Sequence, residues 1–337
     1  MARFVGVTMG MVVLLALGEA FGGGFAVAAL VYITVVAGVM DRLAVLAAPD
    51  HPGAEFPAGT RLAVALALVH FPLLYGGVAV LSSAGPLWER GVLFMALALF
   101  LGQVSNSNAH ELIHRPARAL RWLGAAVYAS VLFGHHASAH VRVHHVWAAT
   151  ERDPNSARPG EGFWRFLARA WRGEFVEGYR AEARLRKGRG GHPYPAYLLG
   201  AAVSLCMAAL IGGGAGVLWL LALAGYAQVQ LYLSDYVQHY GLRRKRLMDG
   251  RPEPVGPRHA WNSPHGFSAA LMLNAPRHSD HHTRPAVPFP GLDVDRSAMP
   301  VLPHSLPVMA VIALVPPLWR RVMDRRVRKW AAATRTN

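Results

Sequence analysis

Cysteine is almost absent from this chain of 337 residues. The single cysteine, Cys206, excludes a disulfide framework within the chain and an iron–sulfur cluster, which is usually held by several thiolates. No glycine-rich dinucleotide fingerprint follows a strand pattern either. If the protein carries out redox chemistry, its electrons must therefore come from another protein.

Charge is scarce over long stretches. Asp, Glu, Lys and Arg make up 16% of the residues, whereas hydrophobic residues make up 53%. Residues 4–40 contain one charged side chain, Glu19, and residues 62–88, 91–109 and 193–234 contain none. Because a helix crosses the hydrocarbon core of a bilayer with about 20 apolar residues, the composition predicts a helical membrane protein.

These stretches predict an all-α, polytopic fold that forms one integral-membrane domain over residues 1–337. About six spans are expected, near residues 4–18, 23–40, 62–84, 91–109, 194–211 and 217–234. Residues 305–319 are uncharged but short and interrupted by proline, so they are predicted to be buried or interfacial. Residues 151–192 mix aromatic side chains with arginine, which is typical of an amphipathic helix on a membrane face.

The basic residues predict an orientation. If Arg3 is cytoplasmic, Arg90 is the only Lys or Arg in the outward-facing turns. This asymmetry favours a multi-pass protein of a bacterial-type inner (plasma) membrane, with both termini inside. The net charge of +15 is then explained by topology and by attraction to anionic lipid and an acidic partner, rather than by nucleic acid, which needs a basic patch on a soluble fold. No cleavage site follows residues 4–18, so the first span is expected to remain.

Histidine, by contrast, is abundant and clustered. Residues four apart on a helix share a face and can reach one metal ion, whereas adjacent residues diverge by about 100° and can serve two. Nine imidazoles exceed what one ion can hold, so the pattern predicts two metal ions on the inner side of the membrane. The nine stand in "HELIH", "HVRVHH", "DYVQHYG" and "HSDHH": His110, His114, His140, His144, His145, His239, His278, His281 and His282.

The remaining histidines that we interpret have ordinary roles. His70, in "VHFPLLY", has no companion ligand and is expected to be a hydrogen-bonded core residue. His51, His192, His259 and His304 are interpreted as loop residues.

A zinc protease is the main alternative. There His110 and His114 would bind zinc and Glu111 would be the general base. That hypothesis leaves seven clustered histidines without a role, although nitrogen ligands suit zinc, copper and iron alike. A non-catalytic metal carrier or transporter is a third possibility.

The motifs "NSNAHELIHR", "HVRVHHVWAATERDPNSARPGEGFW", "DYVQHYGL" and "WNSPHGFSAALMLNAPRHSDHHTRP" resemble those of the alkane 1-monooxygenase family. These membrane-embedded di-iron hydroxylases are related to xylene monooxygenases and, more distantly, to membrane fatty acid desaturases. The resemblance implies that the nine histidines hold two iron ions (Fe2+/Fe3+), which activate O2 to convert an n-alkane to a primary alcohol. It also implies electrons from a rubredoxin-type protein with its reductase. A desaturase, or a fatty-acid or aromatic-methyl hydroxylase, on the same scaffold is the alternative.

Two Fe(II) ions among neutral imidazoles leave about four positive charges uncompensated, so nearby side chains should orient the rings and balance the field. No catalytic residue is expected beyond the metal ligands. Where the family usually has Asn and Glu, this chain has Asp235 and Gln238, and Ala139 replaces a common acidic residue. The candidates for the orienting role are Glu111, Asp153, Asp235, Gln238 and Asp280.

A hydrocarbon substrate requires an apolar channel from the bilayer to the metal ions. Tyr32, Phe71, Tyr75 and Phe94 are candidates to line it, with ordinary helix packing as the alternative for each.

Overall fold

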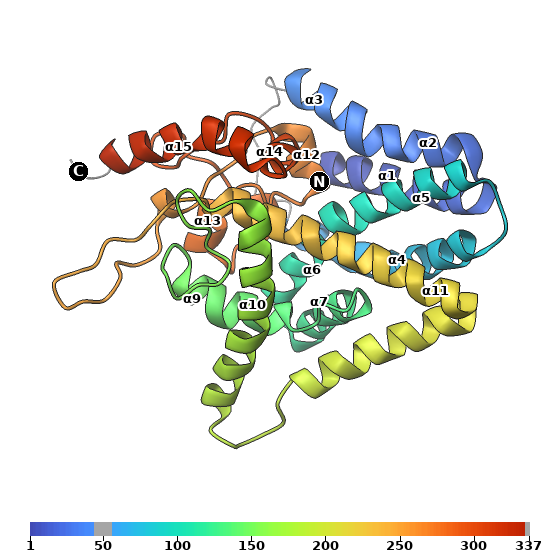
Figure 1. Cartoon of the computed structure of the whole chain (residues 1–337), viewed down its shortest axis with the longest axis horizontal. Helices are drawn as coiled ribbons and strands as arrows, with labels where there is room; N and C mark the ends of the chain where they lie inside the picture. Colours follow the sequence, from blue (N-terminus) through green and yellow to red (C-terminus); the bar gives the residue numbers. More distant parts are fainter. Residues whose placement is uncertain (44–55, 334–337) are drawn as a thin grey trace.

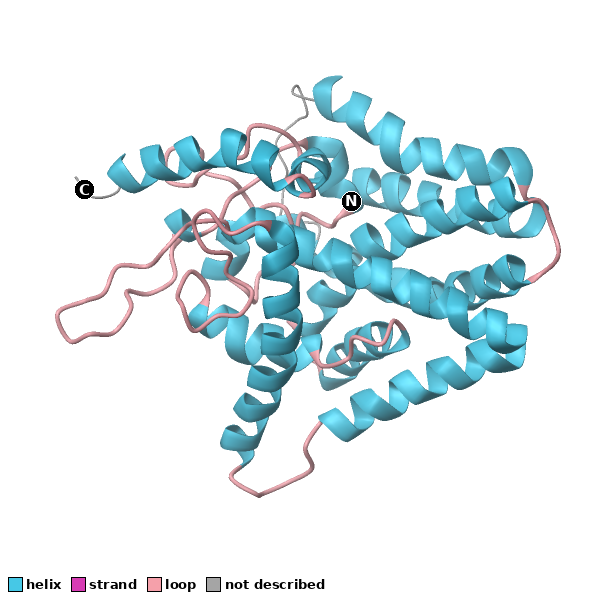
Figure 2. Cartoon of the chain, viewed as in Figure 1, coloured by secondary structure: helices cyan, strands magenta, loops and turns pink. Residues whose placement is uncertain are grey.

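A computed structural model describes residues 1–43 and 56–333. Over these residues the chain consists of helices joined by loops, with no strand (Figure 2). His51 lies outside the described residues. Five of the described helices are long and apolar enough to cross a membrane: Ala2–Phe21, Gly23–Leu43, Gly59–Ser82, Leu87–Ile113 and Tyr194–His239.

The prediction of a helical membrane protein is confirmed, and the difference between six expected spans and five helices has a simple cause. Helix α11 (Tyr194–His239) bends at Gly213, whose φ of 60° suits glycine, so its two arms contain the spans predicted at 194–211 and 217–234. Leu199, Leu210 and Leu218 are exposed on these arms, as expected for side chains that contact lipid.

Two of the other long helices include π-helical turns. The second span consists of α2 (Gly23–Val31), η1 (Tyr32–Val36) and α3 (Ala37–Leu43). The first span is α1 (Ala2–Phe21), and the third is α4 (Phe56–Ser82). The fourth runs through α5 (Leu87–Phe100), the π segment η4 (Leu101–Ser105) and α6 (Asn106–Ile113), so the "HELIH" motif ends a membrane helix.

The molecule has two unlike ends (Figure 1). The turn between α1 and α2, the loop between α4 and α5, and the bend of α11 lie together at one end. Away from that end the chain forms several short helices and loops: α7 (Arg118–Ser130), α8 (His136–Ala139), η5 (His140–His144), α9 (His145–Trp147), η6 (Pro257–His259), α12 (Gly266–Leu271), α13 (His278–Thr283) and η7 (Phe289–Gly291).

The two segments that were predicted to lie at a membrane face or interface, residues 151–192 and 305–319, both contain helices. Helix α10 (Phe163–Arg186) runs crosswise to α11 (Figure 1), and its buried side, which includes Phe166, Ala170 and Glu174, packs against α8 and η5. Residues 305–319 form α14 (Leu306–Ala313) and the start of α15 (Pro316–Ala333) rather than one span, because prolines follow Val315.

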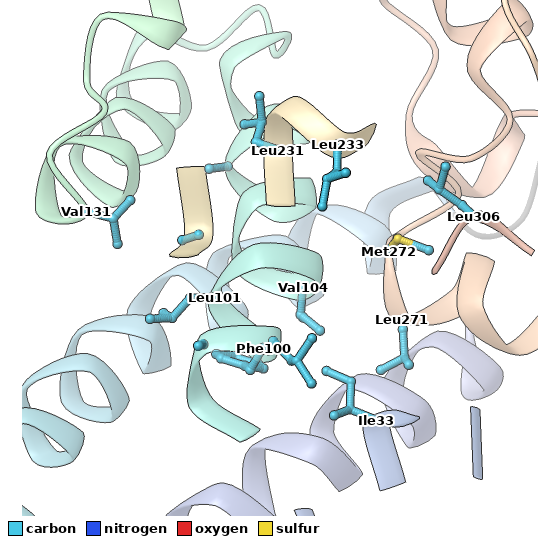
Figure 3. Close-up of a cluster of buried hydrophobic side chains, with 14 of the residues drawn as sticks. Ile33, Phe100, Leu101, Val104, Val131, Leu231, Leu233, Leu271, Met272 and Leu306 are labelled. Carbon is cyan, nitrogen blue, oxygen red and sulfur yellow. The ribbon is translucent and has the colours of Figure 1, made fainter. Parts of the chain in front are cut away.

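A buried apolar cluster connects the membrane-spanning helices with the short helix α12 (Figure 3). Phe100 and Val104 from the fourth span meet Ile33 from η1 and Leu271 from α12. Asp41 adds a polar link, since its Oδ1 accepts hydrogen bonds from the backbone N–H groups of residues 267 and 268 at 3.0 and 2.9 Å, at the start of α12. The end of the second span is thereby fixed to the loop region that carries the last histidine motif.

Candidate metal centre

The structure gathers all nine clustered histidines into two adjoining groups. Within each group the candidate ligand nitrogens lie within 4.8 Å of one another. The ring of His145 in one group lies 4.5 Å from that of His282 in the other, measured between centroids. The five-histidine group contains His110, His114, His140, His145 and His281, and the four-histidine group contains His144, His239, His278 and His282.

The contacts between rings are made by the Nε2 atoms. His140 Nε2 lies 2.8 Å from His110 Nε2 and 3.0 Å from His145 Nε2, which in turn lies 3.0 Å from His281 Nε2. In the second group, His278 Nε2 lies 2.9 Å from His239 Nε2 and 3.1 Å from His282 Nε2. Two nitrogens at right angles on a metal ion, each about 2.1 Å from it, are about 3 Å apart.

Hydrogen bonding alone does not explain this geometry. An imidazole Nε2 has one in-plane site, which carries either a proton or a lone pair, so it makes one good hydrogen bond. His140 Nε2 faces two other Nε2 atoms, and so do His145 Nε2 and His278 Nε2. Nitrogen atoms that converge in this way, without a carboxylate oxygen among them, fit the donor set of a transition-metal ion.

A π-helical turn within the "HVRVHH" motif determines which of its histidines joins each group. His140–His144 forms η5, and hydrogen bonds that close five residues along place residues five apart on one face. His140 therefore joins His145 in the five-histidine group, while His144 turns to the other. The α-helical spacing of four, which suggested that His140 and His144 share one ion, does not apply here. It does apply to His110 with His114 and to His278 with His282.

The protein environment favours neutral rings with available lone pairs. Burial, followed by the neighbouring imidazoles, lowers the pKa of His140, His145 and His281 well below the usual value. Burial, with smaller contributions from other histidines, lowers the pKa of His114 and of His278 to about 3. Metal ligation requires neutral imidazole, so these rings need no costly deprotonation.

His144 differs because it has an acidic partner. Its Nδ1 lies 2.9 Å from the buried Oδ2 of Asp153, which leaves Nε2 to face the other histidines. Burial lowers the pKa of His144, but the charge and hydrogen bond of Asp153 outweigh it and raise that pKa to about 9. This is the carboxylate–histidine arrangement that fixes ring orientation at metal sites.

The other orienting candidates do not contact the nine rings directly. Glu111 Oε1 pairs with Arg115 at 2.7 Å, and Asp280 pairs with Arg284. Gln238 accepts a hydrogen bond from Ser234 Oγ at 2.9 Å and donates one to the carbonyl of residue 275. Asp235 accepts from Asn155 Nδ2 at 2.7 Å. The Oε1 atom of Glu111 also accepts a hydrogen bond from the backbone N–H of residue 289 at 3.3 Å, so this carboxylate is already engaged.

One more buried pair belongs to this region and was missed in the sequence. His136 Nδ1 lies 2.6 Å from Glu174 Oε1, and Asn155 Nδ2 bridges Glu174 Oε2 at 3.0 Å to Asp235. Burial raises the pKa of Glu174, but His136 outweighs it and brings that pKa to about 2, so Glu174 is ionised. The spacing of four residues between His136 and His140 could have placed His136 near the metal centre. No pattern in the sequence marks Glu174, which comes from α10, as its partner.

The isolated histidines follow the sequence interpretation where they are described, except His259. His70 is buried, with Nδ1 2.9 Å from Ser105 Oγ and Nε2 2.8 Å from Ser130 Oγ, which confirms a hydrogen-bonded core residue. His259 ends the short helix η6 rather than lying in a loop, and its Nε2 lies 3.1 Å from Glu253 Oε1. His192 and His304 are outside both groups.

The cavity at the metal centre has different walls from those expected. Tyr32 donates a hydrogen bond to the carbonyl of residue 7, and Tyr75 donates one to Ser204 Oγ. Phe71 packs on His70, and Phe94 packs on aromatic rings of α11. None of these four candidates lines the chamber beside the histidines, so packing is their observed role.

Known proteins are similar to this chain in sequence. A family model described as fatty acid desaturase matches residues 86–312. Alkane 1-monooxygenase 1 of Pseudomonas aeruginosa is 36% identical over 251 residues, which cover 71% of this chain and 64% of that protein. Alkane 1-monooxygenase 2 of Alcanivorax borkumensis is 31% identical over 273 residues, covering 79% and 71% respectively. The xylene/toluene monooxygenase hydroxylase component of Pseudomonas putida is 28% identical over 259 residues.

Fold and site together define a class: helical membrane proteins with histidine groups at one end of the bundle. The chain belongs to the fatty acid desaturase family and to the alkane 1-monooxygenase family. This confirms the resemblance seen in the motifs. The match spans 64% of the length of the Pseudomonas aeruginosa relative, slightly less than two thirds.

Proposed function

We propose that this chain is a membrane-bound, non-haem di-iron monooxygenase that hydroxylates the terminal carbon of an apolar chain such as an n-alkane. The observation that carries the proposal is the pair of adjoining groups whose donor atoms are all histidine nitrogens. In this proposal residues 1–337 act as one hydroxylase domain, and each group holds one iron ion. The net reaction consumes O2, two electrons and two protons, and yields a primary alcohol and water.

The two iron ions would supply the redox chemistry that reduces O2 and oxidises a C–H bond. The chain's own residues bind and position. The nine imidazoles offer nitrogen ligands, Asp153 fixes the orientation of His144, and the surrounding helices bury six of the nine rings fully and the other three in part. The nitrogen-rich donor set supports iron, since imidazole is a suitable ligand for that metal.

Electrons would come from a rubredoxin-type protein and its reductase, since one cysteine cannot hold a cluster. An acidic donor fits the exposed basic side of α15, which includes Arg321, Arg325 and Arg328. The positive-inside distribution supports a bacterial inner-membrane location with the histidine groups on the cytoplasmic side.

The test is product analysis with labelled O2. Membranes that contain the protein, supplied with an n-alkane, a rubredoxin and its reductase, should form a primary alcohol that carries the label. Omission of the rubredoxin and the His281→Ala variant are the controls, and both should abolish the product. An alkene without incorporated label would identify a desaturase and contradict the proposal.

A further inference from the structure

His140 belongs to the five-histidine group but has no hydrogen bond that fixes its ring from behind. Its Nε2 lies 2.8 Å from His110 Nε2 and 3.0 Å from His145 Nε2, whereas its buried Nδ1 has no hydrogen-bond partner. His144, in the same π-helical turn, has Asp153 beside its Nδ1. A ligating imidazole usually donates its other N–H to an oxygen atom, which sets its orientation. The orientation of His140 therefore depends on the side chains packed around it.

The ring of His136, four residues earlier, packs against His140. The two ring centroids lie 5.1 Å apart, with 36° between the ring planes. Phe133 stacks on His136 at 5.1 Å and 14°, and Tyr128 packs edge-on against it at 4.8 Å. His136 is 1% exposed, so its ring has little room to turn. Because a close-packed interior transmits small displacements, the plane of His136 helps to set that of His140.

Glu174 fixes the plane of His136. Nδ1 of His136 lies 2.6 Å from Glu174 Oε1, in a charge-assisted hydrogen bond that the carboxylate accepts. Both side chains are 2% exposed, so water does not compete for this bond. The second oxygen, Oε2, accepts a hydrogen bond from Asn155 Nδ2 at 3.0 Å, so the carboxylate is itself held in orientation.

Small residues allow α10 to bring Glu174 this close to His136. Gly178 lies one turn further along α10, and a Cβ there would lie 2.9 Å from the Cβ of Ala139 and would also meet the hydroxyl of Tyr194. Real Cβ atoms do not approach each other so closely, so α10 crosses α8 at a distance that a larger residue would prevent. The contact between Glu174 and His136 is therefore built into the packing of these two helices.

Asp153 and Glu174 are two buried carboxylates that meet at one asparagine. The backbone N–H of Asn155 donates to Asp153 Oδ1 at 3.1 Å, and its side-chain Nδ2 donates to Glu174 Oε2. The other oxygens point to histidines: Asp153 Oδ2 to His144, and Glu174 Oε1 to His136. Each histidine group thus has its own buried carboxylate, one in direct contact with a member ring and the other separated from it by one ring.

Resting on the two-metal site of the proposed function, we infer that Glu174 and His136 are positioning residues for the five-histidine group. Glu174 orients His136, and His136 holds the ring of His140 in the plane in which its Nε2 faces the other rings of the group. Neither side chain belongs to the two sets of converging donor atoms, so both act through His140 rather than as ligands. Glu174 supports the five-histidine group as Asp153 supports the four-histidine group.

Anaerobic metal titration of the purified, metal-free full chain in detergent tests this without turnover. Glu174→Gln should weaken one of the two sites for Fe(II) by about tenfold, the lower end of the usual effect of such partners, and leave the other site unchanged. A general loss of packing would weaken both sites. Glu177→Gln is the matched control on the same helix: Glu177 pairs with the exposed Arg180, so both affinities should stay unchanged.

Two further variants identify the group that responds and the route of the effect. Glu174→Gln combined with Asp153→Asn should leave no tight site, because the two carboxylates support different groups. His136→Phe keeps a ring against His140 but removes the hydrogen bond to Glu174, so it should weaken the same site about tenfold. In that background Glu174→Gln should have no additional effect, because the route through His136 is already broken.

Unchanged affinities in Glu174→Gln, equal weakening of both sites, a tight site that remains in the double variant, or a full effect in the His136→Phe background overturns the inference. If Glu174→Gln does not fold, His136→Phe alone decides, by weakening one site or not. The hydroxylase proposal is tested separately: a protein with these metal affinities that forms no labelled alcohol retains this inference and loses the proposed function.

Discussion

The two histidine groups differ in how their environment holds them. In the five-histidine group, His110, His114 and His145 are only half-buried. In the four-histidine group all the rings are buried, and His144 is additionally held by Asp153. Both groups reach the chamber, the first through His110 and His140 and the second through His278. The same ligand type thus occurs in a more accessible site and in a more rigid one.

This difference in burial predicts that the two groups differ in how tightly they hold metal and in how easily reactants reach them. Buried rings with a carboxylate partner lose less entropy on metal binding and resist exchange, whereas half-buried rings admit reactants and solvent more easily. We therefore expect the four-histidine group to hold its metal more tightly. We also expect its metal affinity to depend more on neighbouring side chains such as Asp153.

Removal of one ligand from each group should have the largest effect. His282→Ala leaves three rings in its group and His281→Ala leaves four. Both variants should lose iron and lower turnover by about a hundredfold or more, because the remaining rings cannot fill the open position, and His282→Ala should lose more iron. Iron per chain and product formation are the measurements. Full activity with intact metal in either variant would contradict the assignment.

Asp153→Asn should act on one group only. It replaces the carboxylate that orients His144, so metal affinity at the four-histidine group should fall by about 10- to 100-fold while the other group is unchanged. Metal titration of the purified protein measures this. Asp280→Asn is the matched control, since its contacts are with Arg284 and the backbone of residue 293. Equal losses at both groups would show that the groups are not independently supported.

Glu111→Gln should have the smallest effect on chemistry. Glu111 pairs with Arg115 and lies outside both groups, so its loss should cost about 1–3 kcal/mol of stability and change turnover only a few-fold. Thermal unfolding and product formation distinguish the two effects. A general base would instead contribute about 10²- to 10⁴-fold to the rate, so a loss of that size would revive the zinc-hydrolase interpretation.

The long helices and most of the candidate metal ligands could be predicted from the sequence because the patterns that mark them are local. Charge-free runs predict the long helices, since a helix in lipid satisfies its own backbone within one segment. Eight of the nine histidines could be chosen because they recur within a few residues of one another, whereas His239 stands alone in "DYVQHYG". His70 was separable from them because it stands alone in an apolar run.

Features that depend on long-range packing were not accessible. The π-turn that pairs His140 with His145 inserts one residue into a helix, and no pattern in "HVRVHH" marks it. Glu174 reaches His136 only because α10 packs across α8. Tyr75 and Phe94 fit either packing or channel lining until the helices are placed, and the chamber beside the histidines forms only where η4 and α11 meet.

The central claim is that nine histidine nitrogens hold two iron ions, and metal analysis of the purified protein combined with X-ray absorption at the metal edge tests it most directly. The result predicted here is about two iron ions per chain, each surrounded mainly by imidazole nitrogen. About one zinc ion per chain with no iron would contradict it.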